Sequence, residues 1–131
     1  MQKTYELPLY SNKVSAGFPS PADDHLEMKL DLNSYLIKHP AATFFVRASG
    51  DSMVNAGIHS GDLLIVDKSI EPCDGKIVIA ALDGELTVKR LYKRGGEIKL
   101  FAENAAYPPI NITEQDMVIW GVVSYVIHEA K

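Results

Sequence analysis

The sequence predicts a mainly β domain with one or two short helices, preceded by an extended N-terminal arm. Short runs of aliphatic, aromatic and β-branched residues recur between residues 42 and 127. Several of these runs are separated by turn-forming dipeptides that contain glycine, Asp83-Gly84 and Gly95-Gly96. Asp-Gly between two such runs is a strong hairpin signal. The first 30 residues are mostly polar and contain Pro8, Pro19 and Pro21. The sequence therefore predicts a flexible arm at residues 1–30 and a β domain at residues 31–131.

The composition is that of a soluble globular protein. The chain has 131 residues, of which 47% are hydrophobic and 23% are charged. A formal net charge of -4 argues weakly against a protein whose main task is to bind nucleic acid through its phosphates. The single cysteine, Cys73, cannot form an internal disulfide, and no apolar run approaches the roughly 20 residues that cross a bilayer. We expect a cytoplasmic protein without a membrane segment.

The arm contains the stretch VSAGFPSPADD at residues 14–24. Proline removes a backbone donor, fixes its own dihedral angle and pushes the preceding residue toward extended geometry. The stretch is therefore expected to be extended and poorly hydrogen-bonded. Such a conformation would expose the peptide bond between Ala16 and Gly17 to cleavage.

The remaining elements follow in order along the chain. A short helix is predicted in residues 31–40, with Asp31 as its N-cap, Pro40 at its end, and Leu32, Tyr35 and Leu36 facing the core. Strands are predicted at residues 42–49, 62–68, 76–82, 85–93, 97–102 and 117–127. The last of these is expected to bend at Gly121.

Several common functional motifs are missing from the sequence. It has no phosphate-binding glycine loop and no Cys-x-x-Cys pair. The four histidines, at positions 25, 39, 59 and 128, are scattered without metal-binding spacing and are interpreted as surface or loop residues. The segment GDSMV lacks the second glycine of the hydrolase nucleophile elbow, which disfavours a Ser-His-Asp triad on that scaffold. We therefore expect no metal and no cofactor.

Ser52 is the candidate nucleophile. It follows the first core strand, at the start of an expected helical turn, with glycines at positions 50, 57 and 61 around it. The position suits equally well a serine that caps the helical turn, so Ser52 is either a nucleophile or an N-cap residue. A serine hydroxyl becomes a good nucleophile when a neighbouring base removes its proton.

Lys89 is the candidate base. It lies between apolar neighbours in a strand expected to run through the middle of a sheet, where an ammonium group is costly to bury. The alternative is a lysine whose stem packs while its amine reaches water. A free lysine is neutral in only about one molecule in 2,500 at pH 7, but desolvation can lower its pKa by about 3–5 units. A Ser-Lys dyad is a known variant of the catalytic triad.

The segments around these two residues carry a family resemblance. The pattern SGDSM…GI…GDLLIVD…GKIVIAALDGELTVKRL, together with AGFPSPADD and DLN, resembles the LexA/UmuD-type Ser-Lys self-cleaving peptidases. The resemblance implies a C-terminal peptidase domain of twisted antiparallel sheets. It implies Ser52 as nucleophile, Lys89 as general base, and the main-chain N–H groups of Asp51 and Ser52 as the oxyanion hole. The bond between Ala16 and Gly17 matches the bond that these domains cut in their own chain.

Within the family, the resemblance is to the UmuD branch. Only 16 residues precede Gly17, too few for a DNA-reading domain. The implied protein is a homodimer that cleaves itself when stimulated by a RecA–single-stranded-DNA filament in the SOS response to DNA damage. Its shortened form would then join a UmuC-type Y-family polymerase in translesion synthesis, with no sequence-specific DNA binding of its own. The best-known UmuD has cysteine at the position of Ala16. The alanine found here resembles the repressors instead.

Three alternatives remain open at this point. One is a non-cleaving dimeric module that regulates a DNA polymerase, and another is a LexA-type repressor fragment without its DNA-binding domain. Signal peptidases share the Ser-Lys chemistry but require a membrane anchor, which is not evident here. Whether the arm would be cut by its own domain or by the dimer partner is also open.

Overall fold

The computed structural model describes residues 3–11, 13–14, 16–17, 26–112 and 117–131. The chain divides into two compact units, Met1–Lys38 and His39–Lys131. Each is described by itself. No helix in the described ranges is long and apolar enough to cross a membrane.

The first unit contains a two-stranded antiparallel ribbon, followed by a short helix. Strand β1 (Glu6–Tyr10) pairs with β2 (Leu26–Asp31), so that Leu9 lies opposite Met28. This ribbon departs from the irregular chain that the prolines predict for residues 1–30. A two-stranded ribbon has two outer edges, and an edge can accommodate Pro8 because a missing donor there breaks no pairing bond. Pro19 and Pro21 lie outside the described residues.

Helix α1 (Leu32–Leu36) begins where predicted. The Asp31 carboxylate caps it by accepting hydrogen bonds from the main-chain N–H of Asn33 and the hydroxyl of Ser34. The prediction that its apolar residues face a core is wrong, because Leu32 and Tyr35 are 56% and 48% exposed and no residue of the helix is buried. A helix of little more than one turn is too short to form a continuous apolar face.

The second unit is built on one antiparallel sheet of seven strands, in the order β3-β4-β9-β5-β6-β7-β8. All six strands predicted for this part of the chain are present, with ends shifted by at most two residues. The two-residue strand β8 and two 3₁₀ turns are additions too short to leave a periodic pattern. The elements are η1 (Pro40–Ala42), β3 (Thr43–Arg47), η2 (Val54–Ala56), β4 (Leu63–Asp67), β5 (Ile77–Leu82), β6 (Glu85–Arg94), β7 (Glu97–Phe101), β8 (Ile110–Asn111) and β9 (Met117–Ile127).

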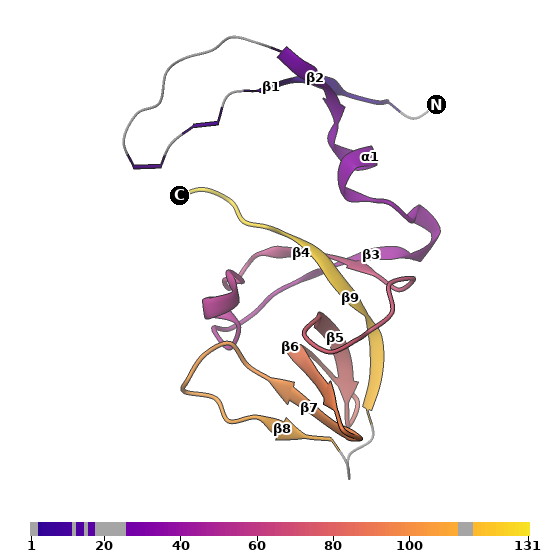
Figure 1. Ribbon diagram of the computed structural model, residues 1–131, viewed down its shortest axis with the longest axis vertical. Helices are drawn as coiled ribbons and strands as arrows, with labels where there is room; N and C mark the ends of the chain where they lie inside the picture. Colours follow the sequence, from indigo (N-terminus) through magenta and orange to yellow (C-terminus); the bar gives the residue numbers. More distant parts are fainter. Residues whose placement is uncertain (1–2, 12, 15, 18–25, 113–116) are drawn as a thin grey trace. The chain divides into compact units, whose positions relative to one another are not determined.

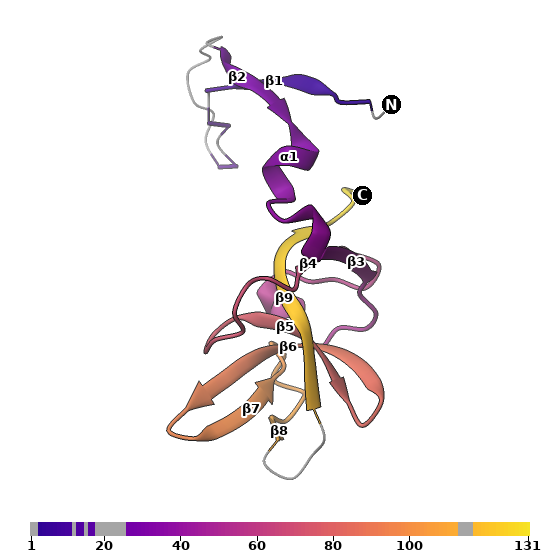
Figure 2. The ribbon, with the colours of Figure 1, turned by 90° about the vertical axis from the view of Figure 1, so that its right-hand side faces the viewer.

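Strand β9 joins the β3–β4 part of this sheet to the part formed by β5, β6, β7 and β8 (Figures 1 and 2). Its first half pairs with β5 and its second half pairs with β4. The register shifts in each pairing, which leaves Trp120 and Ser124 as the extra residues of two bulges. The bend predicted at Gly121 coincides with the first bulge. A Cβ atom at Gly121 would lie 2.7 Å from Cγ1 of Val66, so the close approach of β4 requires a glycine there.

The core has two clusters of buried residues that share β5. Ile79 packs in one cluster with Met53 and Leu64, whereas Val78 and Ala80 pack in the other. Successive residues of a strand point to opposite faces, so β5 is buried on both faces, and this explains its continuous apolar sequence. The turn at Asp83-Gly84 then leads into β6, which lies between β5 and β7 as predicted. Lys89 is thereby placed in the interior of the sheet.

Candidate active site

Ser52 lies in the tight turn between β3 and η2. Gly50 has a φ of +85°, in the left-handed region that favours glycine, and its N–H donates to Ser60 Oγ at 3.2 Å. Met53, next to Ser52, is only 2% exposed and anchors the turn in the core. The cap position of η2 is Met53 and makes no side-chain capping bond. Ser52 therefore does not act as the N-cap of this turn.

The segment after β7 holds Asp51, the residue before Ser52. Asn104 donates its side-chain N–H to the carbonyl of Asp51 at 3.0 Å, and the Tyr107 hydroxyl donates to the Asp51 carboxylate at 2.7 Å. The latter bond raises the pKa of Tyr107. Glu103 of the same segment is paired with Arg90 on β6. The segment after β7 is therefore bonded to the neighbour of Ser52 and to the neighbour of Lys89. No sequence signal identifies the residues of this segment as neighbours of Ser52.

Lys89 and Ser52 are brought together by the fold. Lys89 Nζ lies 3.0 Å from Ser52 Oγ, 2.9 Å from Thr87 Oγ1 and 3.1 Å from the carbonyl oxygen of Val88. Burial lowers the pKa of the Lys89 side chain. In the described part of the chain, no carboxylate forms an ion pair with this amine. Desolvation therefore favours the neutral form of the amine.

The three oxygens around Lys89 Nζ can be satisfied in either protonation state of the amine. A neutral amine has two N–H donors and one lone pair, whereas an ammonium has three donors and no acceptor. The oxygens of Thr87 and Val88 can accept the two N–H bonds. An ammonium would also donate to Ser52 Oγ, whereas the lone pair of the neutral amine is available for the proton of the Ser52 hydroxyl. This geometry suits removal of the serine proton by a general base.

The dyad opens onto a cavity of about 260 Å³ in the second unit. Its walls come from the end of β3 and the first half of β6, and β4 and β5 contribute one side chain each. About half of the lining surface is apolar, and the dyad and three other polar residues line the cavity with it. The lining residues are Val46, Arg47, Ala48, Ser49, Ser52, Leu64, Ile79, Leu86, Thr87, Val88 and Lys89.

The main-chain N–H groups of Asp51 and Ser52, predicted as oxyanion donors, make no hydrogen bond with any residue that the structure describes. Free donors next to a nucleophile can stabilise a developing oxyanion. Ala16 and Gly17, the predicted cleavage site, lie between β1 and β2 in the first unit, and both are exposed. Exposure is what a cleavable bond requires.

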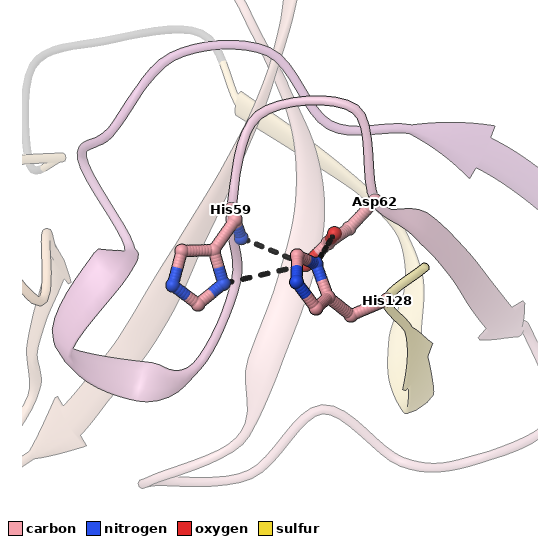
Figure 3. A group of neighbouring side chains, drawn as sticks. All are labelled: His59, Asp62 and His128. Carbon is pink, nitrogen blue, oxygen red and sulfur yellow. Dashed lines mark hydrogen bonds and ion pairs between the residues drawn. The ribbon is translucent and has the colours of Figure 1, made fainter. Parts of the chain in front are cut away.

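His59 and His128, which show no metal-binding spacing in the sequence, share a carboxylate in the structure (Figure 3). His128 Nδ1 lies 2.6 Å from Asp62 Oδ1, and His59 Nδ1 lies 3.8 Å from Asp62 Oδ2. A hydrogen bond from the main chain of His59 lowers the pKa of Asp62. The β4–β9 pairing produces this cluster, and such long-range pairing leaves no spacing motif in the sequence.

His39 forms a similar pair, with its Nδ1 at 2.6 Å from Asp67 Oδ2. Burial by itself would raise the pKa of Asp67, but hydrogen bonds from Ser69 and His39 outweigh it and the pKa is lowered. His25 lies outside the described residues.

Comparisons with known proteins agree with this fold. Residues 8–124 match the peptidase S24-like family. The chain is 52% identical to the protein SamA of Salmonella typhimurium over 95% of this chain and 86% of SamA. It is 47% identical to the protein ImpA of Escherichia coli, over 98% of this chain and 88% of ImpA. The LexA repressor of Pectobacterium carotovorum is 39% identical over 99% of this chain but only 64% of the repressor.

Proposed function

Because the chain belongs to the peptidase S24-like family, among its UmuD-like SOS mutagenesis proteins, we propose that it cleaves itself at the Ala16-Gly17 bond. One observation carries the proposal: Lys89 Nζ lies 3.0 Å from Ser52 Oγ at a cavity, with its other two contacts made to neutral oxygens. Family membership supports a serine peptidase, and this contact supports Ser52 as the nucleophile and Lys89 as the base.

The reaction proceeds through an acyl-enzyme. Neutral Lys89 takes the proton of the Ser52 hydroxyl as Oγ attacks the carbonyl carbon of Ala16. The N–H groups of Asp51 and Ser52 stabilise the oxyanion that forms. The Lys89 ammonium then gives its proton to the Gly17 nitrogen, and the Ala16–Gly17 C–N bond breaks. Lys89 next deprotonates a water molecule, which hydrolyses the Ala16 ester and restores the Ser52 hydroxyl.

The cavity supports a substrate with small side chains at the cut bond. Val46, Leu64 and Ile79 form an apolar lining that suits an alanine methyl group. Gly17 has no Cβ that could obstruct the approach of Ser52 Oγ to the neighbouring carbonyl.

The regulatory part of the proposal concerns partners. The protein forms a homodimer in the cytoplasm, and a RecA–single-stranded-DNA filament stimulates the cut. A flexible arm occupies its reactive pose for a small fraction of the time, and an activator that raises this fraction raises the rate in proportion. The shortened form serves as the accessory subunit of a UmuC-type polymerase. A net charge of -4 fits a protein that acts through protein partners.

The test is an intact-mass time course on the purified full chain. Samples are incubated with and without a RecA–single-stranded-DNA filament at neutral pH, and without the filament at high pH. We expect a product that begins at Gly17 and ends at Lys131, formed faster with the filament and at high pH. A full-length mass that stays unchanged under all of these conditions would contradict self-cleavage and favour a non-cleaving regulatory module.

A further inference from the structure

Three potential metal ligands converge at the site where the turn before β4 meets the end of β9 (Figure 3). His59, Asp62 and His128 each offer one ligand atom, and these atoms lie within 4.8 Å of one another. We propose that these residues bind one divalent transition-metal ion of the zinc type, at a site separate from the Ser52–Lys89 dyad.

The fold builds this cluster from two distant segments. Leu63 pairs with Ile127, so the residue before β4 lies opposite the residue after β9, and Asp62 meets His128. A closed turn brings in the third residue: the His59 N–H donates to the Asp62 carboxylate at 2.8 Å, and the Asp62 N–H donates to the His59 carbonyl at 3.0 Å. The imidazole of His59 is thereby held on the same side as that of His128.

The donor set selects the class of ion. Two imidazole nitrogens and one carboxylate suit zinc, copper or nickel, whereas calcium and magnesium prefer all-oxygen sites. Asp62 is only 3% exposed, and a buried carboxylate needs a positive partner. The imidazoles are half exposed, at 50% and 49%, so an ion can reach them from solvent. Three protein ligands leave a fourth position for water.

The distances need only small adjustments. Zinc ligands at about 2.0–2.2 Å in a tetrahedral arrangement lie about 3.4 Å from one another. Zinc takes one oxygen of Asp62, so both ring nitrogens must reach this distance from the same oxygen; at present His128 Nδ1 lies 2.6 Å from Oδ1 and His59 Nδ1 lies 3.8 Å from Oδ2. Rotation of the two half-exposed rings can achieve both changes. Each ring would be neutral, with its proton on Nε2 and the Nδ1 lone pair on the ion.

A bound ion would reinforce the region that supports Ser52. The turn that carries His59 and Asp62 is bonded to the chain just before the nucleophile: the Ala48 N–H donates to the Asp62 carbonyl, and the Gly61 N–H donates to the Ala48 carbonyl, each at 2.8 Å. The ion would connect this turn to His128 by coordination bonds in place of the present hydrogen bond. We therefore expect metal binding to raise the thermal unfolding midpoint.

The test measures Zn²⁺ binding by calorimetry and Co²⁺ binding by visible absorption. It uses the full chain without a histidine tag and with Cys73→Ser, because Cys73 is an exposed thiol that could bind metal by itself. We expect one ion per chain and a higher unfolding midpoint with Zn²⁺. Loss of a direct ligand by His59→Ala or His128→Ala should weaken binding by at least about tenfold and abolish the rise in midpoint.

His39→Ala is the matched control. Its ring lies at the same 2.6 Å distance from a buried aspartate and is 55% exposed, but it belongs to no three-ligand cluster in the described residues. The control should bind as tightly as the parent chain. The unfolding midpoints without metal must show that all three variants are folded. No binding by the parent at millimolar Zn²⁺, or equal loss in the control and the two site variants, would overturn the proposal.

Discussion

The β1–β2 ribbon and strand β5 show how differently the two units of the chain bury their residues. Every residue of β1 is exposed, and its Leu7 is 62% exposed, whereas Val78 and Ala80 of β5 are fully buried. The candidate cleavage site lies beside the ribbon in sequence, and the Ser52–Lys89 dyad lies in the unit built around β5. A peptide bond must be accessible to be cut, whereas catalytic groups must be held in place. The proposed function thus assigns the substrate to an accessible segment and the catalytic groups to a buried framework.

The largest expected effect concerns the Ser52–Lys89 dyad in the second unit. Ser52→Ala and Lys89→Ala should each reduce self-cleavage by at least about 10³-fold, because one removes the nucleophile and the other removes its base. Lys93→Ala, an exposed lysine on the same strand, is the control and should cleave normally. Intact-mass time courses measure the rates. Cleavage near the parental rate in either dyad variant would assign the nucleophile or the base to another residue.

The pH dependence of the same reaction follows from the lowered pKa of Lys89. In the proposed mechanism the reactive form is the neutral amine, so the rate should rise with pH, by up to about tenfold per pH unit, and level off above that pKa. The free energy of unfolding should also rise between the lowered pKa and 10.5, since the unfolded chain binds more protons there. Rates between pH 6 and pH 10 test the first statement, and a flat profile would contradict it.

A matched pair of leucines tests the difference in burial. Leu100→Ala removes a fully buried side chain from the core of the second unit and should lower the free energy of unfolding by about 2–5 kcal/mol. Leu7→Ala in the exposed ribbon should change it by less than about 0.5 kcal/mol. Urea unfolding followed by circular dichroism measures both values. Similar losses in the two variants would mean that the ribbon is packed in solution.

The smallest expected effect concerns two glycines. Gly121→Ala places a Cβ atom 2.7 Å from Val66 Cγ1 and should cost about 1–3 kcal/mol, part of which Val66→Ala should restore in the double variant. Gly17→Ala has open space around the new methyl group and should leave stability unchanged. Thermal unfolding of the parent, the Gly121→Ala and Val66→Ala variants and the double variant measures the coupling between the two substitutions. Purely additive effects of the two substitutions on β4 and β9 would contradict the close contact.

Much of the fold could be predicted because its signals are local. The alternation and turn pattern around Asp83-Gly84 placed both strands of that hairpin within one residue of their ends. The ribbon in the arm was missed because Pro8 argues against a strand unless the strand is at an edge, and edges depend on pairing. The exposed face of α1 was missed because apolar spacing does not reveal whether a core lies beside the helix.

The sequence by itself determined the strand pattern and the family, together with Ser52 and Lys89 as the candidates for chemistry. Only the tertiary structure decided that their side chains meet, that Lys89 is desolvated enough for its pKa to fall, and that His59, Asp62 and His128 converge. The physical reason is range. Periodicity and turn chemistry act over a few residues, whereas these encounters depend on which strands pair and in which register.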